Sequence, residues 1–210
     1  MGGILIPLSY RVQHLAMTTT PDRFPYPPQQ IRNVFLDRDG VINRKPPEGE
    51  YIGHWSDFHL LPGAASAIAA LNRSGRRVLV VSNQRGVALG LYTAADVDAL
   101  HTRLNQHLAA HAAHIDAFYF CPHDKNQCDC RKPNIGLFEN AFRDFPDASP
   151  ANSIVIGDSI SDIEAARNLG APSIFIQGDP DTQKPGAHQA AALADAVSPS
   201  LAAAVEQFLP

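Results

Sequence analysis

Two aspartates separated by a single residue are the first candidates for chemistry in this sequence. Asp37 and Asp39 stand in the segment Asp37-Arg38-Asp39-Gly40, directly after an apolar run. Carboxylates this close raise each other's pKa unless a cation lies between them. Asp158, which follows another apolar run, could supply a third carboxylate, and an all-oxygen ligand set suits Mg²⁺. Taken alone, an acidic pair before a glycine is equally typical of a turn.

Candidate phosphate-binding groups follow two other apolar runs. Ser82 directly follows the run VLVV and lies close to Gly86 in the sequence, so its hydroxyl could donate to a phosphate oxygen. Lys132 offers a point charge for a phosphate, and the neighbouring Arg131 offers a bidentate guanidinium. Each of these residues alone is also compatible with a simple turn or with solvated surface charge.

The three cysteines of the chain all fall within ten residues. Cys121, Cys128 and Cys130 share this segment with His123. Three thiolates and an imidazole form a typical closed tetrahedral Zn²⁺ site, and four protein ligands leave no open position for water. We therefore predict a structural zinc that fixes the loop; the alternative is three free cysteines grouped by chance. Three cysteines cannot form a disulfide framework.

These residues need a scaffold that brings strand ends together, and the sequence predicts one. Apolar runs alternate with helical patterns along the chain. The predicted strands are 31–36, 77–81, 115–120, 153–156 and 173–176, and the predicted helices are 64–73, 94–113, 136–145, 160–169 and 200–209. This order is typical of an α/β Rossmann-like fold, a three-layer sandwich around a parallel sheet. Ligands of such sheets bind at the carboxyl ends of the strands, where the candidate residues stand.

The composition predicts a single globular domain with a tail. Of the 210 residues 45% are hydrophobic. Residues 1–30 are rich in proline and polar residues, so we expect a flexible tail there and a domain over 31–210. The net charge of −4 argues against a nucleic-acid partner. No apolar run approaches the roughly 20 residues of a membrane span. Without a recognisable signal peptide, we expect a cytoplasmic monomer.

Four segments occur in order, each after a predicted strand: FLDRDGVIN, VVSNQRG, CRKP and VIGDSISD. Together they resemble the motifs of the haloacid dehalogenase (HAD) superfamily of phosphohydrolases. The cysteine segment, CPH…CDCRKP, is similar to that of the capless subfamily IIIA, which includes heptose-bisphosphate phosphatases and histidinol-phosphate phosphatases. No cap-sized insertion separates residues 43 and 62 or 91 and 93, in agreement with a fold that lacks a large cap domain.

The resemblance implies a two-step hydrolysis. Asp37 would be the nucleophile that forms an aspartyl-phosphate, and Asp39 the general acid and base. Mg²⁺ would be held by Asp37, by the main-chain carbonyl of Asp39 and by Asp158, with Asp162 supporting the water shell of the metal. Ser82 and Lys132 would bind the oxygens of the transferred phosphoryl group.

Substrate recognition is also implied by the resemblance. Arg131 would contact a distal phosphate or the sugar, and Asn83 and Arg85 would line the entrance, with Tyr51 on a flap. Relatives usually carry serine at the position of Arg85 and often lysine at that of Ser159, so this chain departs from the pattern at both positions. The added cation at Arg85 could favour a second phosphate or shift specificity.

The function that follows is a Mg²⁺-dependent phosphomonoester hydrolase. The expected substrate is a small phosphorylated sugar, D-glycero-D-manno-heptose 1,7-bisphosphate, cleaved at its 7-phosphate. The alternatives are a histidinol-phosphate phosphatase, another small sugar-phosphate phosphatase or a nucleic-acid 3′-phosphatase. From a different class, a zinc-stabilised binding module without catalysis would have a broken catalytic set, whereas every motif residue is present here.

Overall fold

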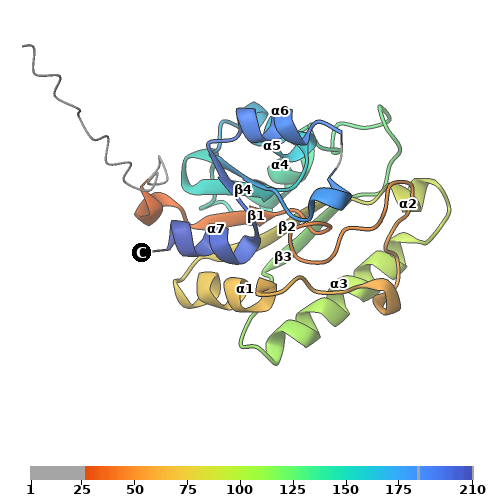
Figure 1. The fold of residues 1–210 in the computed structure, drawn as a ribbon, viewed down its shortest axis with the longest axis horizontal. Helices are drawn as coiled ribbons and strands as arrows, with labels where there is room; N and C mark the ends of the chain where they lie inside the picture. Colours follow the sequence, from red (N-terminus) through yellow and green to blue (C-terminus); the bar gives the residue numbers. More distant parts are fainter. Residues whose placement is uncertain (1–26, 184, 210) are drawn as a thin grey trace, which may run out of the picture.

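The computed structural model describes residues 27–183 and 185–209 (Figure 1). Most of the predicted tail, residues 1–26, lies outside the described residues; within the remainder, Pro28–Gln30 forms a 3-10 helix. The strands are β1 (Asn33–Leu36), β2 (Arg77–Asn83), β3 (Ala117–Cys121), β4 (Ser153–Gly157), β5 (Ser173–Ile176) and β6 (Ala196–Ser198). The helices are α1 (Ala64–Arg73), α2 (Arg85–Ala88), α3 (Ala94–Ala109), α4 (Gly136–Asp144), α5 (Ile160–Leu169), α6 (Ala187–Leu193) and α7 (Leu201–Phe208).

The six strands form one parallel sheet in the order β3-β2-β1-β4-β5-β6. Strand β1 lies between β2 and β4, with Leu36 paired to Val80 on one side and to Ile156 on the other. Because all strands run in the same direction, the segments after β1, β2, β3 and β4 emerge at one edge of the sheet. The predicted site residues therefore converge there.

Helices cover both faces of the sheet, which confirms the three-layer α/β fold (Figure 1). Val34 and Leu36 pack into a core with α1, α3 and α7, whereas Phe35 faces a second core with α4 and α5. The Phe35 ring meets the edge of the Phe138 ring, with centroids 5.0 Å apart. Strands buried on both faces explain the uninterrupted apolar runs in the sequence.

Several elements differ from the sequence prediction, and the short helix α2 was not predicted at all. Helix α3 ends at Ala109 rather than at residue 113, because Ala112 adopts a left-handed φ of 52° and the Ala113 N–H bonds back to Leu108. Residues 178–198 contain α6 and β6, although the sequence predicted no helix or strand there. Asp195 fixes the start of β6 by accepting from the Ser173 N–H at 2.8 Å, a long-range contact without a local sequence signal.

Residues 44–60, here called the pocket loop, follow β1 without forming a cap domain. The base of the loop is closed: Asn43 and Leu60 form an antiparallel bridge, and the Arg44 N–H donates to the carbonyl of His59 at 2.7 Å. The 3-10 helix Trp55–Asp57 lies within it, and the Trp55 ring stacks on Phe58 with centroids 5.2 Å apart. Among the described residues, no helix combines the length and the hydropathy of a membrane span.

Candidate active site

Asp37 and Lys132 meet at the carboxyl edge of the sheet, although 95 positions separate them in the sequence. Lys132 is 4% exposed, and its Nζ donates to Asp37 Oδ1 at 2.8 Å and to the Val81 carbonyl at 2.5 Å. The same ammonium lies 2.6 Å from Asp162 Oδ1. Burial alone lowers the pKa of Lys132, but the charges of Asp162 and Asp37 outweigh it and raise the pKa above its usual value. The lysine is thus a fixed cation beside the predicted nucleophile.

Asp39 accepts hydrogen bonds from three surrounding side chains. The Arg38 guanidinium, which is fully buried, contacts both of its oxygens, at 3.1 Å and 2.9 Å through Nη2, and also donates to the Ile52 carbonyl. Asn43 donates to Asp39 at 2.8 Å and Gln84 at 3.3 Å. Burial raises the pKa of Asp39, but Arg38 and these hydrogen bonds outweigh it and hold the pKa below its ordinary value. Asp39 is therefore held as a carboxylate with a defined orientation.

Three carboxylates form the cluster that could hold a metal ion. Ligand atoms of Asp37, Asp158 and Asp162 all lie within 4.8 Å of one another. Gly40, with a φ of 99°, passes so close to Asp158 that a Cβ there would lie 2.1 Å from its Oδ2. The all-oxygen donor set fits a hard divalent ion such as Mg²⁺. In the structure, Lys45 donates to Asp158 Oδ2, so this cluster is balanced by lysines on both sides.

Asp162 also stabilises the start of α5, besides its contact with Lys132. Its Oδ2 accepts from the Ser159 N–H at 3.0 Å and from the Ser159 hydroxyl at 2.5 Å, which caps the start of α5. Ser159 thus serves as the N-cap of this helix.

The residues that end β2 divide into two roles. Ser82 is buried at the strand end and accepts from Gln84 Nε2 at 3.3 Å. The Asn83 amide is engaged with the main chain of Lys132: its Oδ1 accepts from the N–H at 3.0 Å, and its Nδ2 donates to the carbonyl at 3.1 Å. Asn83 therefore fixes the backbone that carries the lysine.

Arg85 and Arg131 lie beside the cysteine segment. The Arg85 Nε donates to Asp124 Oδ1 at 2.5 Å, and both side chains are about one-third exposed, at 31% and 30%. The hydrogen bond to Asp124 raises the pKa of Arg85, with a further contribution from Tyr51 of the pocket loop. The Arg131 Nη1 donates to the His123 carbonyl at 3.5 Å. Arg85 thus connects the strand end, the cysteine segment and the pocket loop.

The cysteine segment gathers its four predicted ligands. Cys128 Sγ lies 3.5 Å from Cys121 Sγ and 3.3 Å from Cys130 Sγ, and His123 Nδ1 lies 3.3 Å from Cys130 Sγ. A tetrahedral zinc site with ordinary bond lengths has ligand separations of about 3.4–3.8 Å, so the set fits Zn²⁺. Burial raises the pKa of Cys128, but hydrogen bonds from Cys130 and Cys121 outweigh it and lower the pKa to about 7.

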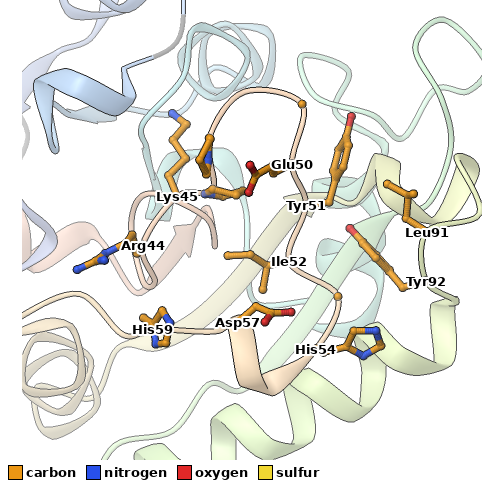
Figure 2. A pocket seen from close by; sticks show the side chains of 14 residues that line it. Arg44, Lys45, Glu50, Tyr51, Ile52, His54, Asp57, His59, Leu91 and Tyr92 are labelled. Atoms are coloured by element: carbon orange, nitrogen blue, oxygen red, sulfur yellow. The ribbon is translucent and has the colours of Figure 1, made fainter.

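A cavity of about 570 Å³ lies beside the catalytic edge, between the pocket loop and the segment after α2 (Figure 2). Lys45 and Tyr92 connect it to the site: Lys45 reaches Asp158, and the Tyr92 hydroxyl donates to Gln84 Oε1 at 3.0 Å. Burial raises the pKa of Tyr92 to about 12, so the hydroxyl stays protonated and can act as this donor. The volume is within the usual range for a small-molecule site.

Sequence reasoning did not identify four of these residues: Arg38, Lys45, Gln84 and Tyr92. Arg38 and Gln84 stand inside the motifs, and their position next to Asp39 and Asn83 was a usable signal. Lys45 and Tyr92 lie on loops without periodicity, where no local pattern marks them.

Comparisons with known proteins agree with this geometry. A family model described as HAD-hydrolase-like matches residues 129–204. The chain is 48% identical over 139 residues to the D-glycero-alpha-D-manno-heptose-1,7-bisphosphate 7-phosphatase of Mycobacterium bovis, covering 66% of this chain and 73% of that protein. It is 41% identical over 187 residues to the D-glycero-D-manno-heptose-1,7-bisphosphate 7-phosphatase of Thermosynechococcus vestitus. That match covers 82% of this chain and 93% of the relative.

The fold is also similar to that of a solved heptose bisphosphate phosphatase. The D,D-heptose 1,7-bisphosphate phosphatase from B. bronchiseptica, complexed with magnesium and phosphate, superposes with a TM-score of 0.74 at 30% identity, covering 85% of this chain and 98% of that one. With 93% of the Thermosynechococcus protein matched at 41% identity and the motifs gathered at one sheet edge, this chain belongs to the heptose-1,7-bisphosphate 7-phosphatase family of HAD phosphatases.

Proposed function

We propose that this protein hydrolyses the 7-phosphate of D-glycero-D-manno-heptose 1,7-bisphosphate. The observation that carries the proposal is the placement of Asp37, held by Lys132, in a carboxylate cluster beside a cavity of about 570 Å³. The names of the relatives support the substrate. Those named for the α anomer share 47–48% identity with this chain, and those named for the β anomer share 32–39%, which favours the α anomer.

The chemistry that these residues support has two steps. A carboxylate oxygen of Asp37 attacks phosphorus and forms an aspartyl-phosphate as the bond from phosphorus to the sugar oxygen breaks. Asp39 must carry a proton for this step and gives it to the departing oxygen, which leaves as the hydroxyl of the sugar. Asp39 then takes a proton from the water that hydrolyses the intermediate, and its carboxylate form suits this second step. Lys132 and Ser82 bind the phosphoryl oxygens and stabilise the charge of the transition state.

Two metal ions complete the proposal. Asp37, the main-chain carbonyl of Asp39 and Asp158 would hold Mg²⁺, which offsets the repulsion between the nucleophile and the phosphate. Cys121, His123, Cys128 and Cys130 would hold a structural Zn²⁺. The close sulfur and nitrogen separations support the second site, and only Arg131 separates Cys130 from Lys132, so the metal would fix the loop that carries the lysine.

A substrate panel tests the function. Phosphate release is measured with both anomers of the heptose bisphosphate and with histidinol phosphate, each with and without Mg²⁺. We expect Mg²⁺-dependent turnover and the highest kcat/KM for the α anomer. A higher kcat/KM for histidinol phosphate would overturn the substrate assignment. Phosphate release that is equal in the Asp37→Asn variant would overturn the mechanism.

A further inference from the structure

Lys45 is a buried cation at the carboxylate cluster that the two-step mechanism does not use. Its Nζ donates to Asp158 Oδ2, and both side chains of the pair are 6% exposed. The residue comes from the pocket loop and lines the cavity (Figure 2). Its side chain extends away from that of its neighbour Arg44 in the same view. Lys45 thus connects the cavity to a carboxylate proposed as a metal ligand.

The two lysines of the cluster are held differently. Lys132 contacts Asp37, Asp162 and the Val81 carbonyl, so three separate elements fix its ammonium. Lys45 reaches Asp158 from the pocket loop through a flexible four-carbon stem. Lys132 can therefore keep its position during the reaction, whereas the Lys45 ammonium can be redirected by rotation of its side chain.

A divalent cation on Asp158 changes the electrostatics around Lys45. The ammonium contacts the same carboxylate that would bind Mg²⁺, and two cations on one carboxylate repel each other. The ligand atoms of Asp158 and Asp37 lie within 4.8 Å, so an ammonium that leaves Asp158 stays beside the phosphoryl position. A phosphate bound at Asp37 would supply the anionic partner that Lys45 then needs.

We propose that Lys45 is an exchangeable counter-ion of the active site and an additional phosphate-binding residue. It neutralises Asp158 in the metal-free protein, releases it when Mg²⁺ binds, and then contacts an oxygen of the phosphate held at Asp37. This inference rests on the proposed Mg²⁺ site but not on the identity of the sugar.

The test measures the binding of Mg²⁺ alone and of inorganic phosphate by isothermal titration calorimetry on the full chain. Lys45→Met removes the ammonium, and Lys45→Gln keeps a donor to Asp158 in case the first variant does not fold. Arg73→Gln, at an exposed position in the last turn of α1, is the control for the change in net charge. Circular dichroism verifies that each variant is folded.

Opposite changes in the two affinities are expected. Without Lys45, Mg²⁺ should bind about three- to tenfold more tightly in the absence of phosphate, because a competing cation is gone. Inorganic phosphate in saturating Mg²⁺ should bind about tenfold more weakly. The control should change both affinities less than about twofold. Unchanged or weaker Mg²⁺ binding would overturn the counter-ion role, and unchanged phosphate binding would overturn the phosphate contact. Absence of Mg²⁺ binding to the wild-type protein would instead contradict the proposed function.

Discussion

His101 provides a quantitative test of the packing behind the active site. This residue of α3 is 3% exposed, and its ring lies parallel to that of Phe118 with centroids 4.3 Å apart. Neither ring nitrogen has a hydrogen-bond partner among the described residues. Burial, together with the charge of Arg38, lowers the pKa of His101 to about 3. The folded protein therefore keeps this imidazole neutral at pH values where an unfolded chain protonates it.

The sign and the size of the effect follow from linkage. In the unfolded chain the pKa returns to about 6.5, so between pH 6.5 and 3 the unfolded state binds a proton that the folded state does not. The free energy of unfolding must fall as the pH drops through this window, and the effect vanishes above it. At pH 5, about 1.5 units below the pKa of the unfolded chain, the free energy of unfolding should be about 2 kcal/mol lower than at pH 8 because of His101 alone.

Urea denaturation at pH 8 and pH 5 measures this loss, with wild-type protein compared to His101→Phe and His101→Leu. Each protein is compared with itself at two pH values, so the cost of repacking cancels. We expect the wild type to lose about 2 kcal/mol more than either variant between pH 8 and pH 5. An equal loss in wild type and variants would refute the reasoning, because it would mean that His101 is protonated in the folded state.

Four further substitutions test the site itself. Asp37→Asn removes the nucleophile and should lower kcat at least about 10⁴-fold in a phosphate-release assay, with the fold intact by circular dichroism. Gly40→Ala places a Cβ 2.1 Å from Asp158 Oδ2 at a φ of 99°, so it should lower the free energy of unfolding in urea by about 2 kcal/mol or more and weaken Mg²⁺ binding. Cys128→Ser should remove zinc, measured by elemental analysis, and lower Tm by about 5 °C or more. Arg85→Ser should raise KM for the heptose bisphosphate about tenfold and leave KM for the heptose 7-monophosphate unchanged, because only the bisphosphate has a distal phosphate.

Each of these predictions has an outcome that contradicts it. Residual turnover of Asp37→Asn within tenfold of wild type would exclude the covalent step. Wild-type stability of Gly40→Ala would contradict the close approach of Asp158. Full zinc content in Cys128→Ser would mean that the thiol is not a ligand. Equal increases in KM for both substrates of Arg85→Ser would assign the guanidinium to the sugar or to the loop rather than to the distal phosphate.

The placement of the main site residues could be predicted from the sequence because the fold itself brings them together. Parallel strands end at one edge, so Asp37, Ser82 and Asp158 converge once their strands are recognised. The cysteine segment is local in sequence, and its four predicted ligands lie within ten residues. In both cases the prediction depends on short stretches of sequence: each strand with the residues that follow it, and the cysteine segment.

The residues that the sequence did not indicate depend on contacts between distant segments. The buried position of Arg38 requires the Ile52 carbonyl of the pocket loop to fold back onto it. Lys45 and Tyr92 reach the site from loops whose path is decided by tertiary packing. Strand β6 has three residues and depends on the contact of Asp195 with Ser173, so its propensity alone was too weak to identify it.

The closed base of the pocket loop has a consequence for how this enzyme could diverge. The loop leaves the catalytic edge after Asn43 and returns at Leu60, and these two residues are paired as a bridge. The hydrogen bond between Arg44 and His59 supports the same junction, and the Leu61 N–H donates to the Ile42 carbonyl at 2.9 Å. Because these contacts fix both ends, the residues between them can be exchanged as a cassette at little cost in loop-closure entropy. A segment that lines the cavity can then change as a unit while the two aspartates after β1 stay in place.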